Sequence, residues 1–287
     1  MDEKNEGFRI VITGKGGVGK TTLTSCLARY LAKGETNVLA VDEDPQMNLP
    51  YALGLPVEEA AKIIPLNRNL DYIEEKTGVR PGKSWGKMFR LGPRVEDVIG
   101  RFGVKVTERL SLLVMGTVVQ AAAGCLCAEN VLLDSVIRHL SLRKNEAILL
   151  DTQAGVEHFG RALVKGFSQC LVVADGTFNA LSVARHSAEL AREIGIPYVH
   201  LVINRVGAGG EEKLKRFDTM MKTDTGELFD RIILLDAEAR FEDLEPNVTR
   251  ILDDPESGYS KGIAALAATL LEFEMKAPDV TQGRSAS

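Results

Sequence analysis

Residues 14–22 read Gly14-Lys15-Gly16-Gly17-Val18-Gly19-Lys20-Thr21-Thr22, follow the apolar run Phe8–Thr13 and open the amphipathic stretch Thr21–Lys33. They fit the pattern G-x-x-x-x-G-K-[ST] in the strand-to-helix context that this pattern requires. The glycines let backbone N–H groups turn inward around phosphate oxygens, and the positive end of the following helix strengthens that field. Lys20 is expected to reach the β- and γ-phosphates of a nucleotide, and the Thr21 hydroxyl to bind Mg²⁺. All nine residues of this P-loop are predicted to bind the nucleotide.

Short apolar runs alternate with amphipathic stretches along most of the chain. The runs are continuous, as expected for strands whose two faces are both covered by helices. Predicted strands are Phe8–Thr13, Asn37–Val41, Leu110–Met115, Ala147–Leu150, Leu171–Ala174, Val199–Ile203 and Ile232–Leu235. Predicted helices are Thr21–Lys33, Ala128–Leu142, Ala180–Gly195 and Ile263–Met275. This order predicts an α/β fold: a doubly wound, mostly parallel sheet flanked by helices, of the P-loop NTPase type.

The composition narrows the class of protein. The 287 residues are 45% hydrophobic and 26% charged, and the formal net charge of −5 argues against a surface built to bind nucleic acid or anionic lipid. No apolar run approaches the roughly 18 residues of a membrane-spanning helix, and the acidic, polar start is unlike a secretory signal. We expect a cytoplasmic protein with reduced cysteines, a single P-loop domain over residues 1–275 and a disordered polar tail over 276–287.

Residues 66–109 interrupt the alternation, because they contain no clear strand and are rich in basic side chains. These are Arg80, Lys83, Lys87, Arg90, Arg94, Arg101, Lys105 and Arg109. We favour the interpretation of a solvated insertion that covers one edge of the sheet. The alternative is a docking surface for an acidic partner.

Lys15 is a second lysine, near the start of the P-loop. With this second lysine, the loop resembles the deviant form of the P-loop found in the family of MinD, ParA and the nitrogenase iron protein. The resemblance implies an ATP-sandwich homodimer in which Lys15 of one subunit contacts the nucleotide of the other. The alternative is that Lys15 adds positive charge to its own phosphate site.

Two carboxylate segments extend the resemblance. Val41–Pro45 resembles the first switch of that family, by which Asp44 would activate the attacking water and Asp42 would support hydrated Mg²⁺. Asp151 ends an apolar run, the arrangement of a Walker B magnesium ligand. It leads into a stretch that resembles the second switch, whose Gly155 N–H would sense the γ-phosphate. Asn204 resembles a strand-end asparagine that binds adenine, although a turn-forming asparagine is a serious alternative.

Cys125 and Cys127 form a C-x-C pair. Alternate residues of an extended segment point the same way, so two thiolates can converge on one soft metal ion. Because a tetrahedral sulfur site needs four ligands, a symmetric dimer would supply the other two. The alternative is that both are small core residues. Cys26 and Cys170 are expected in the core, and the histidines are treated as structural: His139, His158, His186 and His200.

The segment Gly124–Asn130, taken with Ala154–His158, resembles the CooC-type accessory ATPases. These proteins mature nickel–iron–sulfur carbon monoxide dehydrogenase, and related members serve acetyl-CoA synthase. The resemblance implies that the paired cysteines bind nickel or zinc and that ATP binding and hydrolysis drive nickel delivery to such a client. Gln153 departs from the family pattern and leaves the client open.

Two alternative functions fit the sequence less well. A redox ATPase of the nitrogenase-iron-protein type would need a cluster thiolate just beyond Asp151, where the chain has Thr152-Gln153-Ala154. A MinD- or ParA-like positioning ATPase would need a basic amphipathic terminal helix or a basic DNA surface, whereas Ile263–Met275 carries Glu272 and Glu274. We therefore expect neither a nucleic-acid nor a membrane partner.

Overall fold

The computed structural model describes residues 7–81, 90, 93–116, 128–140, 145–156, 164, 166–206 and 209–276. Within this part of the chain, eight strands form one sheet in the order β3-β4-β2-β5-β1-β6-β7-β8. All neighbouring strands are parallel except β3, which runs antiparallel to β4. The strands are β1 Phe8–Gly14, β2 Asn37–Asp42, β3 Val104–Lys105, β4 Leu110–Val114, β5 Glu146–Asp151, β6 Gln169–Ala174, β7 Tyr198–Ile203 and β8 Arg231–Leu234. The predicted doubly wound α/β fold is confirmed.

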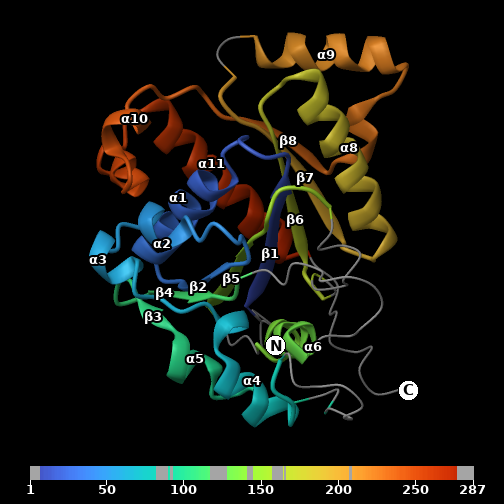
Figure 1. Cartoon of the computed structure of the whole chain (residues 1–287). Coiled ribbons are helices and arrows are strands. Elements are labelled where there is room, and N and C mark those ends of the chain that lie inside the picture. Colours follow the sequence, from blue (N-terminus) through green and yellow to red (C-terminus); the bar gives the residue numbers. More distant parts are fainter. Residues whose placement is uncertain are drawn as a thin grey trace, which may run out of the picture.

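Helices cover both faces of the sheet. The longer ones are α1 Lys20–Lys33, α6 Ala128–His139, α8 Phe178–Glu193, α9 Gly210–Met221 and α11 Gly258–Glu274. The shorter ones are α2 Leu49–Ala52, α3 Val57–Ala60, α4 Leu70–Thr77, α5 Val98–Phe102 and α10 Phe241–Leu244, with 3₁₀ turns η1 Leu66–Arg68, η2 Thr225–Leu228 and η3 Val248–Asp253. Figure 1 shows α1 and α11 together on one side of the sheet and α6 and α8 on the other.

Capping side chains explain where the predicted helices differ from the observed ones. Helix α8 begins two residues earlier than predicted because Thr177 accepts the N–H of Ala180, and α11 begins at Gly258 because Ser257 accepts the N–H of Ser260. Helix α9 was not predicted. It buries only Gly210 and Phe217 and is mostly polar, so its sequence offers few apolar residues to mark a helix.

The core lies between the sheet and its two helical layers. Every residue of β6 is buried, as expected for a central parallel strand. Cys26 and Cys170 are fully buried there, which confirms their predicted place in the core, and burial raises the pKa of the Cys26 thiol to about 12. His200 is also buried and shares a hydrogen bond with Gln169 (3.1 Å). No helix in the described ranges has both the length and the apolar character needed to cross a bilayer.

The segment 66–109 forms one edge of the sheet. The expectation of no strand there is wrong for β3, which is too short to give a sequence signal yet pairs with β4. Arg80 contacts Asp71 (2.6 Å) and Glu74 (2.9 Å). Arg101 contacts Glu75 (2.8 Å) and Asp97 (3.3 Å). Arg80 and Arg101 are thus paired within the segment itself, whereas Lys83 and Lys87 lie outside the described residues. The solvated insertion stays a prediction.

Candidate nucleotide-binding site

The P-loop leaves β1 in a conformation that only glycine adopts without strain. Gly14 has φ +144°, and a Cβ built there would lie 2.2 Å from the carbonyl oxygen of Val173 in β6. The loop then turns into α1, where Leu23 N–H donates to the Gly19 carbonyl (2.9 Å). The tight contact with β6 fixes the start of the loop on the central strands.

Gly14→Ala is expected to lower the free energy of unfolding by about 3 kcal/mol, because the new methyl group meets a backbone carbonyl at a positive φ. Gly16→Ala is the matched control, since its Cβ would lie 3.5 Å from the Ala154 side chain, an ordinary contact. The control should change the unfolding free energy by less than about 0.5 kcal/mol. Urea denaturation of both variants measures the difference, and equal losses would contradict the steric argument.

Lys20 begins α1 and is buried. Its ammonium donates to the carbonyls of Gly14 (3.2 Å) and Lys15 (3.2 Å). Burial lowers the pKa of Lys20, while the negative charges of Asp151 and Asp44 oppose this shift. The side chain therefore holds a positive charge against the loop, where phosphate oxygens would compensate its lost hydration.

Asp151 lies at the carboxyl end of β5 and is almost fully buried. Thr21 Oγ1 donates to its Oδ2 (2.7 Å), and Thr24 Oγ1 donates to its Oδ1 (3.3 Å). Burial raises the pKa of this carboxyl to about 6, although the bond from Thr21 and the charge of Lys20 oppose the shift. The hydroxyl and carboxylate are hard oxygen donors of the kind that Mg²⁺ prefers, so this pair fits the ion. Thr24 was missed, although its spacing of three residues from Thr21 on one helix face was a usable signal.

Asp42 lies opposite Asp151 in the parallel register of β2 and β5. Its Oδ1 accepts the N–H of Asp44 (2.9 Å) and its Oδ2 accepts the N–H of Leu49 (3.2 Å). Burial, and next the neighbouring charge of Asp151, raise the pKa of Asp42 well above its usual range. Asp42 thus holds the turn that carries Asp44, whose own carboxylate accepts the N–H of Gln46 (2.8 Å).

Gly155 lies against the P-loop at φ +110°. Its N–H donates to the Gly14 carbonyl (3.4 Å), and its carbonyl accepts a bond from Thr13 Oγ1 (3.4 Å). Gly155 therefore adjoins the loop, and its predicted role in sensing a γ-phosphate stays a prediction. To meet a γ-phosphate, its N–H would have to exchange the weak bond to Gly14 for a phosphate oxygen.

Asn204 follows β7 and is buried. Its amide nitrogen donates to the carbonyl of Val18 in the P-loop (2.9 Å). Its Oδ1 has no hydrogen-bond partner in the described part of the chain. The Asn204 amide thus bonds to the P-loop through its nitrogen, while its oxygen remains available as an acceptor. The predicted contact with adenine stays a prediction.

The comparisons with known proteins agree with this geometry. Residues 10–243 match the CobQ/CobB/MinD/ParA nucleotide binding domain. The chain belongs to this family. It is therefore a P-loop ATPase.

Two relatives are similar over most of the chain. An uncharacterised ATP-binding protein of Methanocaldococcus jannaschii is 41% identical over 208 residues, which are 72% of this chain and 79% of the relative. The carbon monoxide dehydrogenase accessory protein CooC of Rhodospirillum rubrum is 36% identical over 201 residues, 70% of this chain and 75% of the relative. Among solved structures, the MinD cell division protein of Aquifex aeolicus superposes with a TM-score of 0.61 at 22% identity, covering 93% of this chain and 97% of that one. This last likeness supports the fold.

The predicted metal ligands of the ATPase, Cys125 and Cys127, lie outside the described residues, as does His158. Within those residues there is no group of three or more His, Cys, Asp or Glu side chains that could hold a metal ion. Lys15 is exposed at the P-loop. The pKa of Asp175 is lowered: burial opposes the shift, hydrogen bonds from Thr177 produce most of it, and the charge of Lys15 adds a smaller part.

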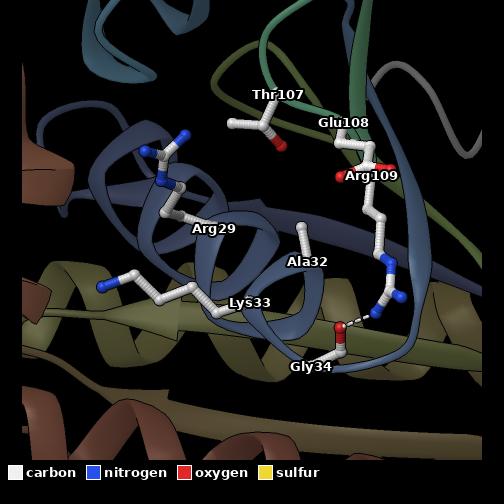
Figure 2. Close-up of a pocket in the computed structure, with 7 residues that line it drawn as sticks. All are labelled: Arg29, Ala32, Lys33, Gly34, Thr107, Glu108 and Arg109. Carbon is white, nitrogen blue, oxygen red and sulfur yellow. Dashed lines mark hydrogen bonds between the residues drawn. The ribbon is translucent and has the colours of Figure 1, made fainter.

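A cavity of about 340 Å³ lies at the C-terminal end of α1, away from the P-loop (Figure 2). It is lined by Arg29, Ala32, Lys33, Gly34, Thr107, Glu108 and Arg109. Lys33 donates to the Leu252 carbonyl (3.3 Å) and lies 3.6 Å from Asp253, and Arg109 donates to the Gly34 carbonyl. Two of its cations, Lys33 and Arg109, are thus bound to the protein itself.

Proposed function

We propose that this ATPase is a maturation factor that delivers nickel to carbon monoxide dehydrogenase or acetyl-CoA synthase, using ATP binding and hydrolysis in a homodimer. The observation that carries the proposal is the 36% identity over 201 residues with the carbon monoxide dehydrogenase accessory protein CooC. The C-x-C pair Cys125 and Cys127 supplies thiols suited to a soft cargo ion. We assign the activity to a single domain over residues 1–275, with 276–287 as a tail.

In this proposal the site residues divide the work of ATP hydrolysis. The P-loop N–H groups and Lys20 bind the phosphates, Thr21 and Asp151 hold Mg²⁺, and Asp44 orients the attacking water. When bound, the magnesium ion neutralises charge on the phosphate oxygens. Asp42 supports the hydrated magnesium ion and also holds the turn that carries Asp44, because its two carboxylate oxygens accept the N–H groups of Asp44 and Leu49.

Dimerisation is tested at Lys15. Lys15→Ala is expected to leave the affinity for ADP within about threefold of wild type, because the exposed side chain is not needed in its own phosphate nest. ATP hydrolysis should fall by about two orders of magnitude, the size of effect of removing one cationic donor in trans. Mass measurement by light scattering with ATP should show a dimer for wild type and a monomer for the variant. A monomeric wild type that hydrolyses ATP would contradict the homodimer.

Nickel binding is tested with the double variant Cys125→Ser/Cys127→Ser, titrated with Ni²⁺ in the presence of ADP or ATP. Wild type should bind about one ion per dimer, with an affinity that changes with the nucleotide, since coupling between two ligands is reciprocal. The double variant should lose this binding and keep its affinity for ADP. Cys26→Ala is the control, because a buried thiol with a raised pKa is a poor ligand.

Equal Ni²⁺ binding by the double variant and wild type would refute nickel delivery. Retention on DNA, or co-sedimentation with liposomes in the presence of ATP, would instead favour a positioning ATPase.

A further inference from the structure

Two consecutive residues after β7 hold two consecutive carbonyls of the P-loop. Asn204 Nδ2 donates to the Val18 carbonyl (2.9 Å), and Arg205 Nη1 donates to the Gly17 carbonyl (3.1 Å). Asn204 lies so close that a Cβ on Gly19 would meet its Nδ2 at 2.5 Å. Arg205 is neither a predicted nucleotide contact nor a predicted magnesium ligand.

These contacts determine where the amides of the loop point. In a trans peptide unit the C=O and the N–H point in opposite directions. Holding the Gly17 carbonyl outward therefore directs the Val18 N–H inward, and holding the Val18 carbonyl outward directs the Gly19 N–H inward. Inward N–H groups form the nest that binds phosphate oxygens.

Arg205 adopts a backbone conformation that is unusual for its residue type. Its φ is +58°, in the left-handed region that side chains other than glycine, asparagine and aspartate seldom enter. The backbone is fixed on both sides, because Asn204 N–H donates to the Ala174 carbonyl (2.7 Å) and Val206 N–H donates to the Leu235 carbonyl (3.1 Å). A strained residue held by its neighbours is typical of a position where the strain serves a site.

We propose that Arg205 is a positioning residue for the phosphate nest: it holds the Gly17 peptide from outside the loop, so that the Val18 N–H is in place before the nucleotide arrives. The inference rests on the proposed nucleotide site and is independent of the metal cargo. It predicts that Arg205 affects nucleotide affinity more than the rate of hydrolysis, because the nest is used in ground state and transition state alike.

The test compares Arg205→Gly with Lys222→Gly. Lys222 is also exposed and also left-handed (φ +53°), at the end of α9, so both variants remove one positive charge and relieve the same kind of strain. By calorimetry, Arg205→Gly should raise the Kd for Mg-ADP about five- to tenfold, the loss expected for one charge-assisted hydrogen bond. Lys222→Gly should leave the Kd unchanged. Without nucleotide, Arg205→Gly should melt below Lys222→Gly, because only Arg205 loses a side-chain bond to the P-loop.

Kinetics and rescue complete the test. In Arg205→Gly, KM for ATP should rise about as much as the Kd while kcat stays within about threefold. Arg205→Lys, which keeps a donor, should recover most of the affinity. If Arg205→Gly kept the wild-type Kd, or if Lys222→Gly lost as much affinity, the role of Arg205 would be refuted and the nucleotide site would stand. Failure of wild type to bind Mg-ADP would overturn the nucleotide site as well.

Discussion

Lys20→Ala is expected to lower kcat for ATP hydrolysis by about two to three orders of magnitude, the usual effect of removing one donor that faces developing phosphate charge. The buried ammonium lies against the Gly14 and Lys15 carbonyls, at the centre of the phosphate nest. Because the ammonium is expected to contact phosphate already in the ground state and to gain strength in the transition state, affinity for ADP should fall as well as kcat. This separates Lys20 from Lys15, whose substitution is expected to spare ADP binding. Steady-state hydrolysis and ADP calorimetry on both variants measure the contrast.

The fold should survive the loss of Lys20. Its pKa is lowered by burial, so the charged form is held in the native state at a cost. Thermal unfolding of Lys20→Ala without nucleotide should therefore stay within about 2 °C of wild type. If the variant kept more than a tenth of the wild-type rate, Lys20 would not be the phosphate-binding lysine.

Asp151→Asn is expected to abolish most hydrolysis while making the nucleotide-free protein more stable at neutral pH. The fall in kcat should be about two to three orders of magnitude, because the proposed magnesium ligand and the acceptor for Thr21 are both weakened. The gain in stability follows from the raised pKa of about 6 in the folded state, compared with 3.8 for an ordinary aspartate. Above pH 6 the native state must hold a buried carboxylate, which costs about 2–3 kcal/mol relative to the unfolded chain.

The stability difference between Asp151→Asn and wild type should depend on pH. A carboxyl whose pKa is raised on folding stabilises the fold below its unfolded pKa and loses that contribution as the pH rises through the folded value. The variant should therefore melt about 2–5 °C above wild type at pH 8, after the lost bonds from Thr21 and Thr24 are included. This gap should narrow below pH 6 and close toward pH 4. Asp175→Asn is the control of opposite sign, because the pKa of Asp175 is lowered. A gap that widens toward low pH would refute the assignment.

The sheet and the phosphate loop could be predicted from the sequence because they depend on local signals. Continuous apolar runs mark buried parallel strands, and the spacing of Gly14, Gly19 and Lys20 marks the loop. What escaped prediction depends on contacts between distant segments. The two-residue strand β3 exists only because β4 offers it an edge. Thr24 gains its role from Asp151, and Arg205 from the Gly17 carbonyl. The sequence shows the acidic residues that form ion pairs with Arg80 and Arg101, but it does not show that they lie next to these arginines.

The bond between Asn204 and the P-loop joins residues 186 positions apart. During synthesis the loop emerges early, yet this bond to its outer side requires β7, made much later. Since domains fold as units while the chain leaves the ribosome, a nascent chain ending before residue 204 would carry the complete G-x-x-x-x-G-K-[ST] motif without the bonds from Asn204 and Arg205. Truncated or partly translated chains should therefore bind ATP weakly. Tight nucleotide binding would require that the sheet is complete through β7.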